Sequence, residues 1–239
     1  MKDRRGVTLI ELLVAVSLLG LLMAGILTAL HTGANAMERA NARLTDNRRL
    51  AGAGRIIEQQ IAGFVPVVAE CQSQIEGRPS VRLPFFEGAP SSMRFVSAYS
   101  LGEGWRGYPR ILEFQIISGE PGQGVRLIVN EHLYTGPLSA GVFCLGTAFD
   151  GTLGLQVPLF RPIEPGPYSF VLADRLAAAH FSYLTPPAPN QPSEWVERWI
   201  LPRWPRAVRI EMAPLEADAV RLPPLSGTVP VRITAPPEG

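Results

Sequence analysis

A long uncharged stretch lies near the start of the chain. No Asp, Glu, Lys or Arg occurs between Leu12 and Leu30. Its length is close to the ~20 residues that a helix needs to cross a ~30 Å hydrocarbon core. A glycine, Gly6, and one acidic residue, Glu11, lie just before it. The pattern predicts a helix that is apolar on every side and suited to a membrane or to a helical assembly.

Beyond this stretch the apolar residues recur at spacings of three and four, which is typical of one face of a helix. They are Leu30, Ala34, Met37, Ala40 and Leu44, then, after a one-residue phase change, Leu50, Gly54, Ile57, Ile61 and Phe64. Charged residues occupy the opposite face. We therefore predict one helix over residues 8–62 whose second half is amphipathic and needs a sheet to lie on. Gly63 and Pro66 end it.

From Ser91 the apolar residues alternate with a period of two, which predicts strands. The predicted strands are 93–100, 111–118, 125–134, 138–145, 169–173, 180–185, 195–201, 207–212 and 229–234. Residues 67–90 are interpreted as a linking region, and 118–124 as a hairpin loop. Short neighbouring strands with brief turns favour antiparallel pairing. The predicted fold class is α+β, with a long N-terminal helix packed on an antiparallel sheet.

Composition agrees with a β-rich body and argues against some partners. The chain has 23 glycines and 23 prolines in 239 residues, which is high for a helical bundle. The net charge is +1, and the lysines and arginines are scattered rather than gathered in a basic stripe. Nothing in this pattern indicates a nucleic-acid partner.

The leader indicates an orientation. Lys2, Arg4 and Arg5 stand just before the apolar stretch, which predicts a cytoplasmic N-terminus and a body on the outer side of the membrane. Two cysteines, Cys71 and Cys144, are too few for a disulfide framework. An oxidising compartment favours one bridge between them, but their spacing leaves both outcomes open, one disulfide or two free thiols.

Two ordinary interpretations of the first residues leave features unexplained. A secretory signal peptide would use Ala34-Asn35-Ala36 as its cleavage site, but its apolar region would usually be 7–15 residues long. A plain membrane anchor leaves Glu11 without a role, although a charge within a membrane helix costs ~2.5–3.5 kcal/mol at the centre.

A third interpretation accounts for Gly6 and Glu11 together. The segment GVTLIELLVAVSLLGLLMAG resembles the class III leader and N-terminal helix of type IV pilins and type II secretion pseudopilins. In that family a prepilin peptidase cuts after the glycine on the cytoplasmic face and then N-methylates the new first residue. The resemblance implies cleavage between Gly6 and Val7 and methylation of Val7. The family usually has Phe or Met at that position, so Val7 is a mild departure.

The motif continues with Thr8, Leu9 and Ile10, which together with Glu11 we call the assembly segment. After cleavage Val7 would carry a positive amine at the end of an apolar helix. An amine and a carboxylate that are buried separately are each costly, whereas a pair compensates. Glu11 could approach its own terminus, one turn away. The resemblance implies instead that it meets the Val7 amine of a neighbouring subunit and sets the axial register. The alternative is that Glu11 only extends to the lipid headgroups.

Later segments narrow the resemblance. Residues 48–65, RRLAGAGRIIEQQIAGFV, resemble the helix end of J-type minor pseudopilins, although Gln60 stands where an acidic residue is usual. J-type proteins also carry a strand ending in tyrosine, a tryptophan-bearing strand and a P-R-A-V-R-I segment. This chain has similar features at Tyr183, at Trp195 and Trp199, and at residues 205–210. Minor pilins of type IV pili share this layout.

The sequence contains no recognisable catalytic constellation. It lacks G-x-S-x-G, a Walker loop, H-E-x-x-H and C-x-x-C. His31, His132 and His180 are too scattered to form a metal site, and no acidic loop suggests calcium. We therefore expect no enzyme activity, no cofactor and no metal.

The sequence thus predicts a minor pseudopilin, a structural subunit near the tip of a type II secretion pseudopilus. The first alternative is a minor type IV pilin that acts in adhesion, DNA uptake or motility. The second is a secreted or anchored enzyme or binding protein with an ordinary signal peptide.

The predicted organisation has four parts: a leader (1–6), a transmembrane and assembly helix (7–30), its amphipathic continuation (31–64) and a periplasmic body (65–239). The chain would cross the bacterial inner membrane once and enter a pseudopilus. The resemblance implies four partners: other minor pseudopilins, the major pseudopilin, the prepilin peptidase and the inner-membrane secretion platform.

Overall fold

The computed structural model describes residues 8–72, 80–102, 106–151, 154–187, 192–215 and 225–232. The chain divides into two compact units, Met1–Asn47 and Arg48–Gly239, which we describe one at a time. The second unit is the body. Helix α1, Leu9–Ala62, contributes its beginning to the first unit and its last turns to the body.

The first part of α1, Leu9–Leu30, is unburied and carries one charged residue, Glu11. From Leu9 to Leu30 every side chain is exposed, and Leu9 is 81% exposed. Its polar side chains bond within the helix, because the hydroxyls of Ser17, Thr28 and Thr32 each donate to the carbonyl four residues earlier, at 2.8 Å. Internal hydrogen bonds of this kind let hydroxyl residues remain in an apolar surrounding.

The body is built on an eight-stranded sheet with the order β12-β11-β9-β6-β5-β4-β3, and β10 pairs with β9 beside this path. Each neighbouring pair is antiparallel. The strands are β3 (Glu87–Ala89), β4 (Ser92–Tyr99), β5 (Arg106–Ser118), β6 (Val125–Leu133), β9 (Phe170–Leu184), β10 (Trp195–Val196), β11 (Ala207–Pro214) and β12 (Leu225–Pro230).

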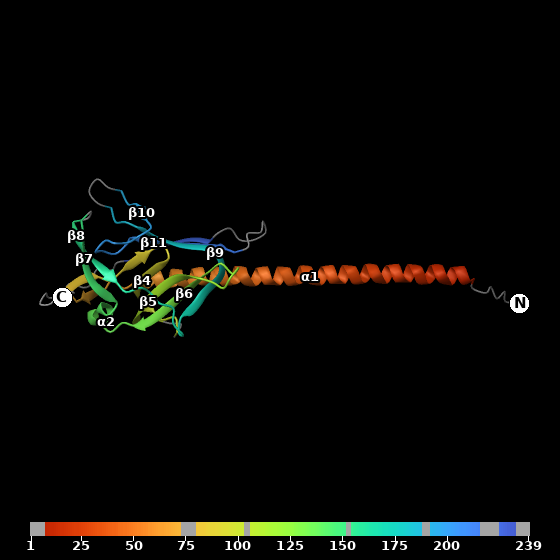
Figure 1. Cartoon of the computed structure of the whole chain (residues 1–239), viewed down its shortest axis with the longest axis horizontal. Coiled ribbons are helices and arrows are strands. Elements are labelled where there is room, and N and C mark those ends of the chain that lie inside the picture. Colours follow the sequence, from red (N-terminus) through yellow and green to blue (C-terminus); the bar gives the residue numbers. More distant parts are fainter. Residues whose placement is uncertain are drawn as a thin grey trace. The chain divides into compact units, whose positions relative to one another are not determined.

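The last turns of α1 bury one face against this sheet, and Figure 1 shows them among the strands. Leu50, Ala53, Ile57 and Ile61, spaced three and four apart, are all buried. They share one apolar cluster with residues of the central strands, among them Phe95. Burying each large side chain contributes roughly 1.5–3 kcal/mol. The amphipathic half was predicted to begin at residue 31, but the apolar face is covered only in these last turns, since Leu30, Met37 and Leu44 are 65%, 72% and 54% exposed.

A smaller assembly lies beside the main sheet. Strands β1 (Val68–Cys71) and β2 (Val81–Pro84) form one antiparallel pair, and β7 (Cys144–Asp150) and β8 (Leu155–Phe160) form another. The short helix α2, Pro137–Gly141, precedes β7. We call residues 137–160 the α2–β7–β8 module.

The module approaches β1 closely at Gly141. A side-chain carbon added to this glycine would lie 2.2 Å from the carbonyl oxygen of Glu70. Only glycine permits this contact between the two backbones. A second apolar cluster, which includes Ala69, Phe85 and Ala140, also contains Val96 of β4 and Ile111 of β5, so it joins the module and β1–β2 to the main sheet.

The structure confirms the α+β class and the long N-terminal helix, and it corrects two expectations near the module. The predicted linking region, 67–90, contains β1, β2 and β3. These strands have only three or four residues each, too few to show an alternating pattern. The predicted strand 138–145 is wrong, because α2 occupies its first part and β7 starts only at Cys144. Pro137 favours the first turn of a helix there.

Four further corrections concern the later strands. The predicted strands 169–173 and 180–185 are one strand, β9, whose continuity was hidden by the alanines at 177–179, which are poor strand formers. The 195–201 strand is reduced to β10, and Trp199 instead makes an isolated bridge to Gly88. The last strand is β12 rather than 229–234, of which residues 233 and 234 lie outside the description. Strand β8 was missed because Pro158 argues against a paired strand.

Candidate functional site

The assembly segment forms the first turn of α1. Gly6 and Val7 lie outside the described residues, and Thr8 is the first residue described. The Thr8 hydroxyl accepts a long hydrogen bond, 3.4 Å, from the backbone nitrogen of Glu11, and the Thr8 carbonyl accepts from the same nitrogen and from that of Leu12. Thr8 therefore caps the helix, with Glu11 at the spacing of a capping box.

Glu11 lies in the first turn of α1, at the positive end of the helix dipole. It is exposed in the first turn, where the positive end of the helix dipole stabilises a carboxylate by roughly 0.3–1 kcal/mol. Among the described residues no side chain forms an ion pair with it. The geometry leaves its carboxylate available to a positive group outside this part of the chain. The T-x-x-E motif thus has two consequences: Thr8 caps the helix, and the Glu11 carboxylate is available to a positive group. Only the availability of the carboxylate was predicted from the sequence.

A cluster of buried ionised side chains, the ion cluster, lies within the body, and it was not predicted from the sequence. Arg94 on β4 is 0% exposed. Its Nε and Nη2 atoms lie 2.8 and 2.7 Å from Oε1 of Glu113, on the neighbouring strand β5. Its Nη1 atom pairs with Glu87, on β3. A fully buried guanidinium is tolerated only with such compensation.

Glu113 is the most heavily bonded carboxylate of the cluster. Its Oε2 accepts from Asn130 Nδ2 at 3.2 Å and lies 3.1 Å from His132 Nε2. Burial raises the pKa of Glu113, but the hydrogen bond from His132 and the charge of Arg94 outweigh it, so this pKa lies below its ordinary value. For Glu87 burial is the larger effect, and its pKa is raised despite Arg94.

Arg94 also reaches the α2–β7–β8 module and the residue that follows it. Its Nη2 donates to the carbonyl oxygen of Arg161 at 2.8 Å. Its guanidinium lies 5.3 Å from the ring centre of Phe143 and 5.6 Å from that of Phe160. These are cation–π distances. The cluster thus joins the main sheet to the module.

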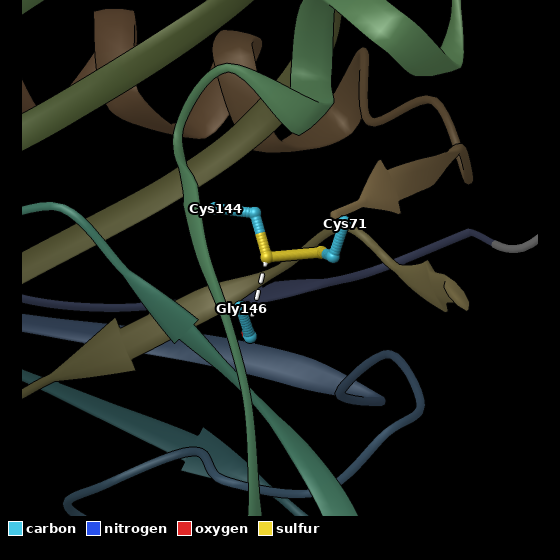
Figure 2. The surroundings of a disulfide bond; sticks show 3 residues. All are labelled: Cys71, Cys144 and Gly146. Carbon is cyan, nitrogen blue, oxygen red and sulfur yellow. Dashed lines mark hydrogen bonds between the residues drawn. A yellow bond between two sulfur atoms is a disulfide. The ribbon is translucent and has the colours of Figure 1, made fainter. Parts of the chain in front are cut away.

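Cys71 and Cys144 form a disulfide, shown in Figure 2. Their Cα atoms are 5.4 Å apart, and the bond connects the end of β1 to the start of β7. The carbonyl oxygen of Gly146 lies 3.3 Å from the Cys144 sulfur, which carries no proton and so only contacts it. Gly146 has φ +134° and marks a bulge in β7, which turns the strand next to the bond.

The histidines do not come together. His132 belongs to the ion cluster, His180 lies 3.9 Å from Glu197, and His31 is exposed on α1. Within the described ranges no group of three His, Cys, Asp or Glu side chains is placed to hold a metal ion.

Comparison with known proteins found a family motif in the N-terminal segment. Residues 1–27 match the family model for the prokaryotic N-terminal methylation motif. A search of curated proteins found no match to the chain. The stretch Leu9–Asn41, which overlaps the motif, is long and apolar enough to cross a membrane.

The motif and the helix support a type IV pilin-like protein that is anchored in a membrane. They favour a structural subunit over an enzyme, and imply processing by a prepilin peptidase and assembly into a pilus-like filament. The family model does not cover the later segments that resemble J-type pseudopilins.

Replacing Arg94 with alanine should destabilise the body by about 3–5 kcal/mol, because Glu113 would be left buried without a compensating charge. The matched control is Arg82→Ala, since Arg82 is 70% exposed and 3.8 Å from Glu70. That change should cost less than about 1 kcal/mol. Urea unfolding of the full chain in detergent, followed by tryptophan fluorescence, measures both. Equal costs would contradict the compensating role of Arg94.

The two carboxylates predict opposite pH dependences. Because the pKa of Glu113 is lowered in the folded state, its contribution to stability is complete above the ordinary value of 4.5 and is lost as the pH falls through the lower folded pKa. Because the pKa of Glu87 is raised, its contribution is complete below 4.5 and is lost as the pH rises through the higher folded pKa.

The Glu113→Gln variant should therefore lose less unfolding free energy than the wild type on acidification below pH 4.5. The matched variant Glu87→Gln should keep that loss and instead flatten the profile just above pH 4.5. Urea midpoints across this range report both slopes. If Glu113→Gln lost as much stability below pH 4.5 as the wild type, the assigned direction of the shift would be wrong.

Proposed function

We propose that the protein is a minor pseudopilin, a structural subunit of the tip complex of a type II secretion pseudopilus. The observation that carries the proposal is the pairing of the methylation motif at residues 1–27 with an apolar helix whose side chains from Leu9 to Leu30 are all exposed. So much unburied apolar surface requires a membrane or neighbouring helices. In a pilin-like subunit the membrane would cover this surface in the precursor, and neighbouring helices would cover it in the filament.

In this proposal the prepilin peptidase cuts between Gly6 and Val7 and methylates the amine of Val7. Residues 1–6 are the leader and 7–30 the transmembrane and assembly helix. Residues 31–64 continue the helix, and 65–239 form the periplasmic body. Lys2, Arg4 and Arg5 favour a cytoplasmic N-terminus, so the body lies on the outer side of the inner membrane.

The role of Glu11 follows from its position in the assembly segment. Its carboxylate is exposed at the positive end of α1, one turn from Val7. In a filament it would be surrounded by apolar helices, where a lone carboxylate is costly and a pair with a neighbouring amine is not. We propose that Glu11 accepts the methylated Val7 amine of an adjacent subunit, which fixes how far one helix can slide along the next.

The J-type assignment rests on the resemblance of residues 48–65 and of the segments around Tyr183, Trp199 and Arg206. Tyr183 is buried, and its hydroxyl donates to the carbonyls of Ala89 and Ser92, at 2.9 and 3.0 Å. The indole nitrogen of Trp199 donates to the carbonyl of Arg203 at 2.7 Å. These residues therefore stabilise the body, and the proposed partners, other minor pseudopilins, the major pseudopilin and the secretion platform, contact other surfaces.

Replacing Glu11 with glutamine should leave cleavage intact but reduce incorporation into the filament roughly tenfold or more, because the amine of the neighbour loses its counter-charge. Glu11→Asp keeps the charge and should retain most incorporation. Gly6→Val serves as a processing-blocked control and should leave only uncut precursor in the membrane. The measurement is the ratio of sheared filament to membrane-bound protein. Normal incorporation of Glu11→Gln would disprove the pairing.

Deletion of the gene separates the pseudopilus from a type IV pilus. We expect loss of type II secretion with surface pili retained, because a tip subunit is required for its own filament. Quantifying secreted protein and surface pili in the same strain tests this, with the wild-type gene supplied in trans as the control. Retained secretion with lost adhesion, DNA uptake or motility would instead identify a minor type IV pilin.

A further inference from the structure

We infer that the Cys71–Cys144 disulfide is an oxidation-dependent clasp for the α2–β7–β8 module, made by exchange with a protein disulfide before the module closes on the body. The inference rests on the proposed location of the body outside the cytoplasm and is the same for a pseudopilus and a type IV pilus. It concerns how one part of the body is held in place and which class of reactant completes it.

The module has little hydrogen-bonded attachment to the main sheet. Strands β7 and β8 pair with each other in a two-stranded sheet that is separate from the eight-stranded one. A two-stranded sheet is marginally stable by itself. The helix that precedes it, α2, has only five residues. The module therefore depends on contacts with other elements to remain folded.

Its apolar contacts are limited, because much of its apolar surface faces solvent. Val142 is 57% exposed, Phe149 66% and Leu159 43%. The inner side places Phe143 and Phe160 near Phe85, with ring centres 6.4 and 5.6 Å from it. These aromatic contacts and the Arg94 bond to Arg161 are non-covalent, so the disulfide is the covalent attachment of the module to β1.

The order of events follows from burial. Cys71 is 1% exposed in the closed body, so an external protein cannot reach its sulfur once the module covers it. Exchange must therefore take place while the module is open. A protein disulfide of an oxidising compartment is the reactant of the required class.

The disulfide forms by two successive thiol–disulfide exchanges. The Cys71 thiol loses its proton, and the thiolate attacks one sulfur of the oxidant's disulfide, breaking that bond and forming a mixed disulfide. The thiolate of Cys144 then attacks the Cys71 sulfur and releases the oxidant as a dithiol. Two electrons pass from the two cysteines to the oxidant, and the two protons that they lose reach its thiolates through solvent.

The consequence of a missing bond should be local. The cluster beneath the module takes Val96 from β4 and Ile111 from β5, whereas most buried residues of β9 and β11 belong to the main cluster against α1. Without the bond, the module should open and leave Phe85 and Arg94 accessible, while the eight-stranded sheet keeps its own core against α1. Opening of one unit within an otherwise folded protein is measurable by hydrogen exchange.

The test uses the full chain in detergent micelles, as wild type and as Cys71→Ser, Cys144→Ser and the double variant. We expect amide exchange across residues 137–151 and 154–164 to rise roughly tenfold or more in all three variants, since each removes the same bond. Exchange in β9 and β11 should change less than about twofold. Ser80→Ala is the matched control, because it removes a 2.7 Å hydrogen bond to Glu70 in the same β1–β2 pair and leaves the disulfide intact.

Two exchange results would overturn the inference. Unchanged exchange across the module would show that the non-covalent contacts suffice. An equal rise throughout the body, including complete failure to fold, would show that the bond stabilises the whole body rather than clasping one part.

A second measurement uses Cys144→Ser, in which Cys71 is the remaining thiol. With the module open, Cys71 should be alkylated within about tenfold of its rate in the urea-unfolded chain. A rate roughly a hundredfold slower, with β11 protected from exchange, would show that the module stays closed without the bond and would also overturn the inference.

Discussion

The apolar surface of α1 is the constraint on which the rest of the structure depends. In its last turns the helix is apolar on one face only, and the sheet covers that face through Leu50, Ala53, Ile57 and Ile61. In its first turns it is apolar all round, and its hydroxyl groups bond within the helix. One sequence therefore prescribes a buried interface in the body and an uncovered segment that must find lipid or other helices.

In the body, the α2–β7–β8 module must be held against the eight-stranded sheet, from which its own two strands are separate. Arg94 serves this purpose from inside, because its charge is compensated by Glu113 and Glu87 and its faces contact Phe143 and Phe160. The Cys71–Cys144 bond serves it at the same end of the module, because Cys144 follows Phe143 and pairs with Phe160 across β7 and β8. In the chain-entropy model, closing a loop with a sequence separation of 73 contributes about 4 kcal/mol, of the same order as breaking the ion cluster.

Periodicity was enough to predict the helix and the strands in the centre of the sheet. The strands there are rich in apolar residues on both faces, because Ile111 belongs to the second apolar cluster and its neighbour Leu112 to the main one. The ion cluster could not be predicted, because Arg94 looks like an outward-facing strand residue until β5 and the module come to lie beside it. The disulfide was left open for the same reason, since only tertiary contacts bring β1 to β7. The motif of the assembly segment was visible because its residues are consecutive, although its capping by Thr8 was missed.

The mass of the mature N-terminal peptide tests the central claim most directly. The protein is purified from the membrane of cells that contain a prepilin peptidase, digested and analysed by mass spectrometry. The account predicts a chain that begins at Val7 with one methyl group on its amine. A chain that begins at Met37, after the Ala34-Asn35-Ala36 site, would show that the apolar segment is an ordinary signal peptide and would contradict it.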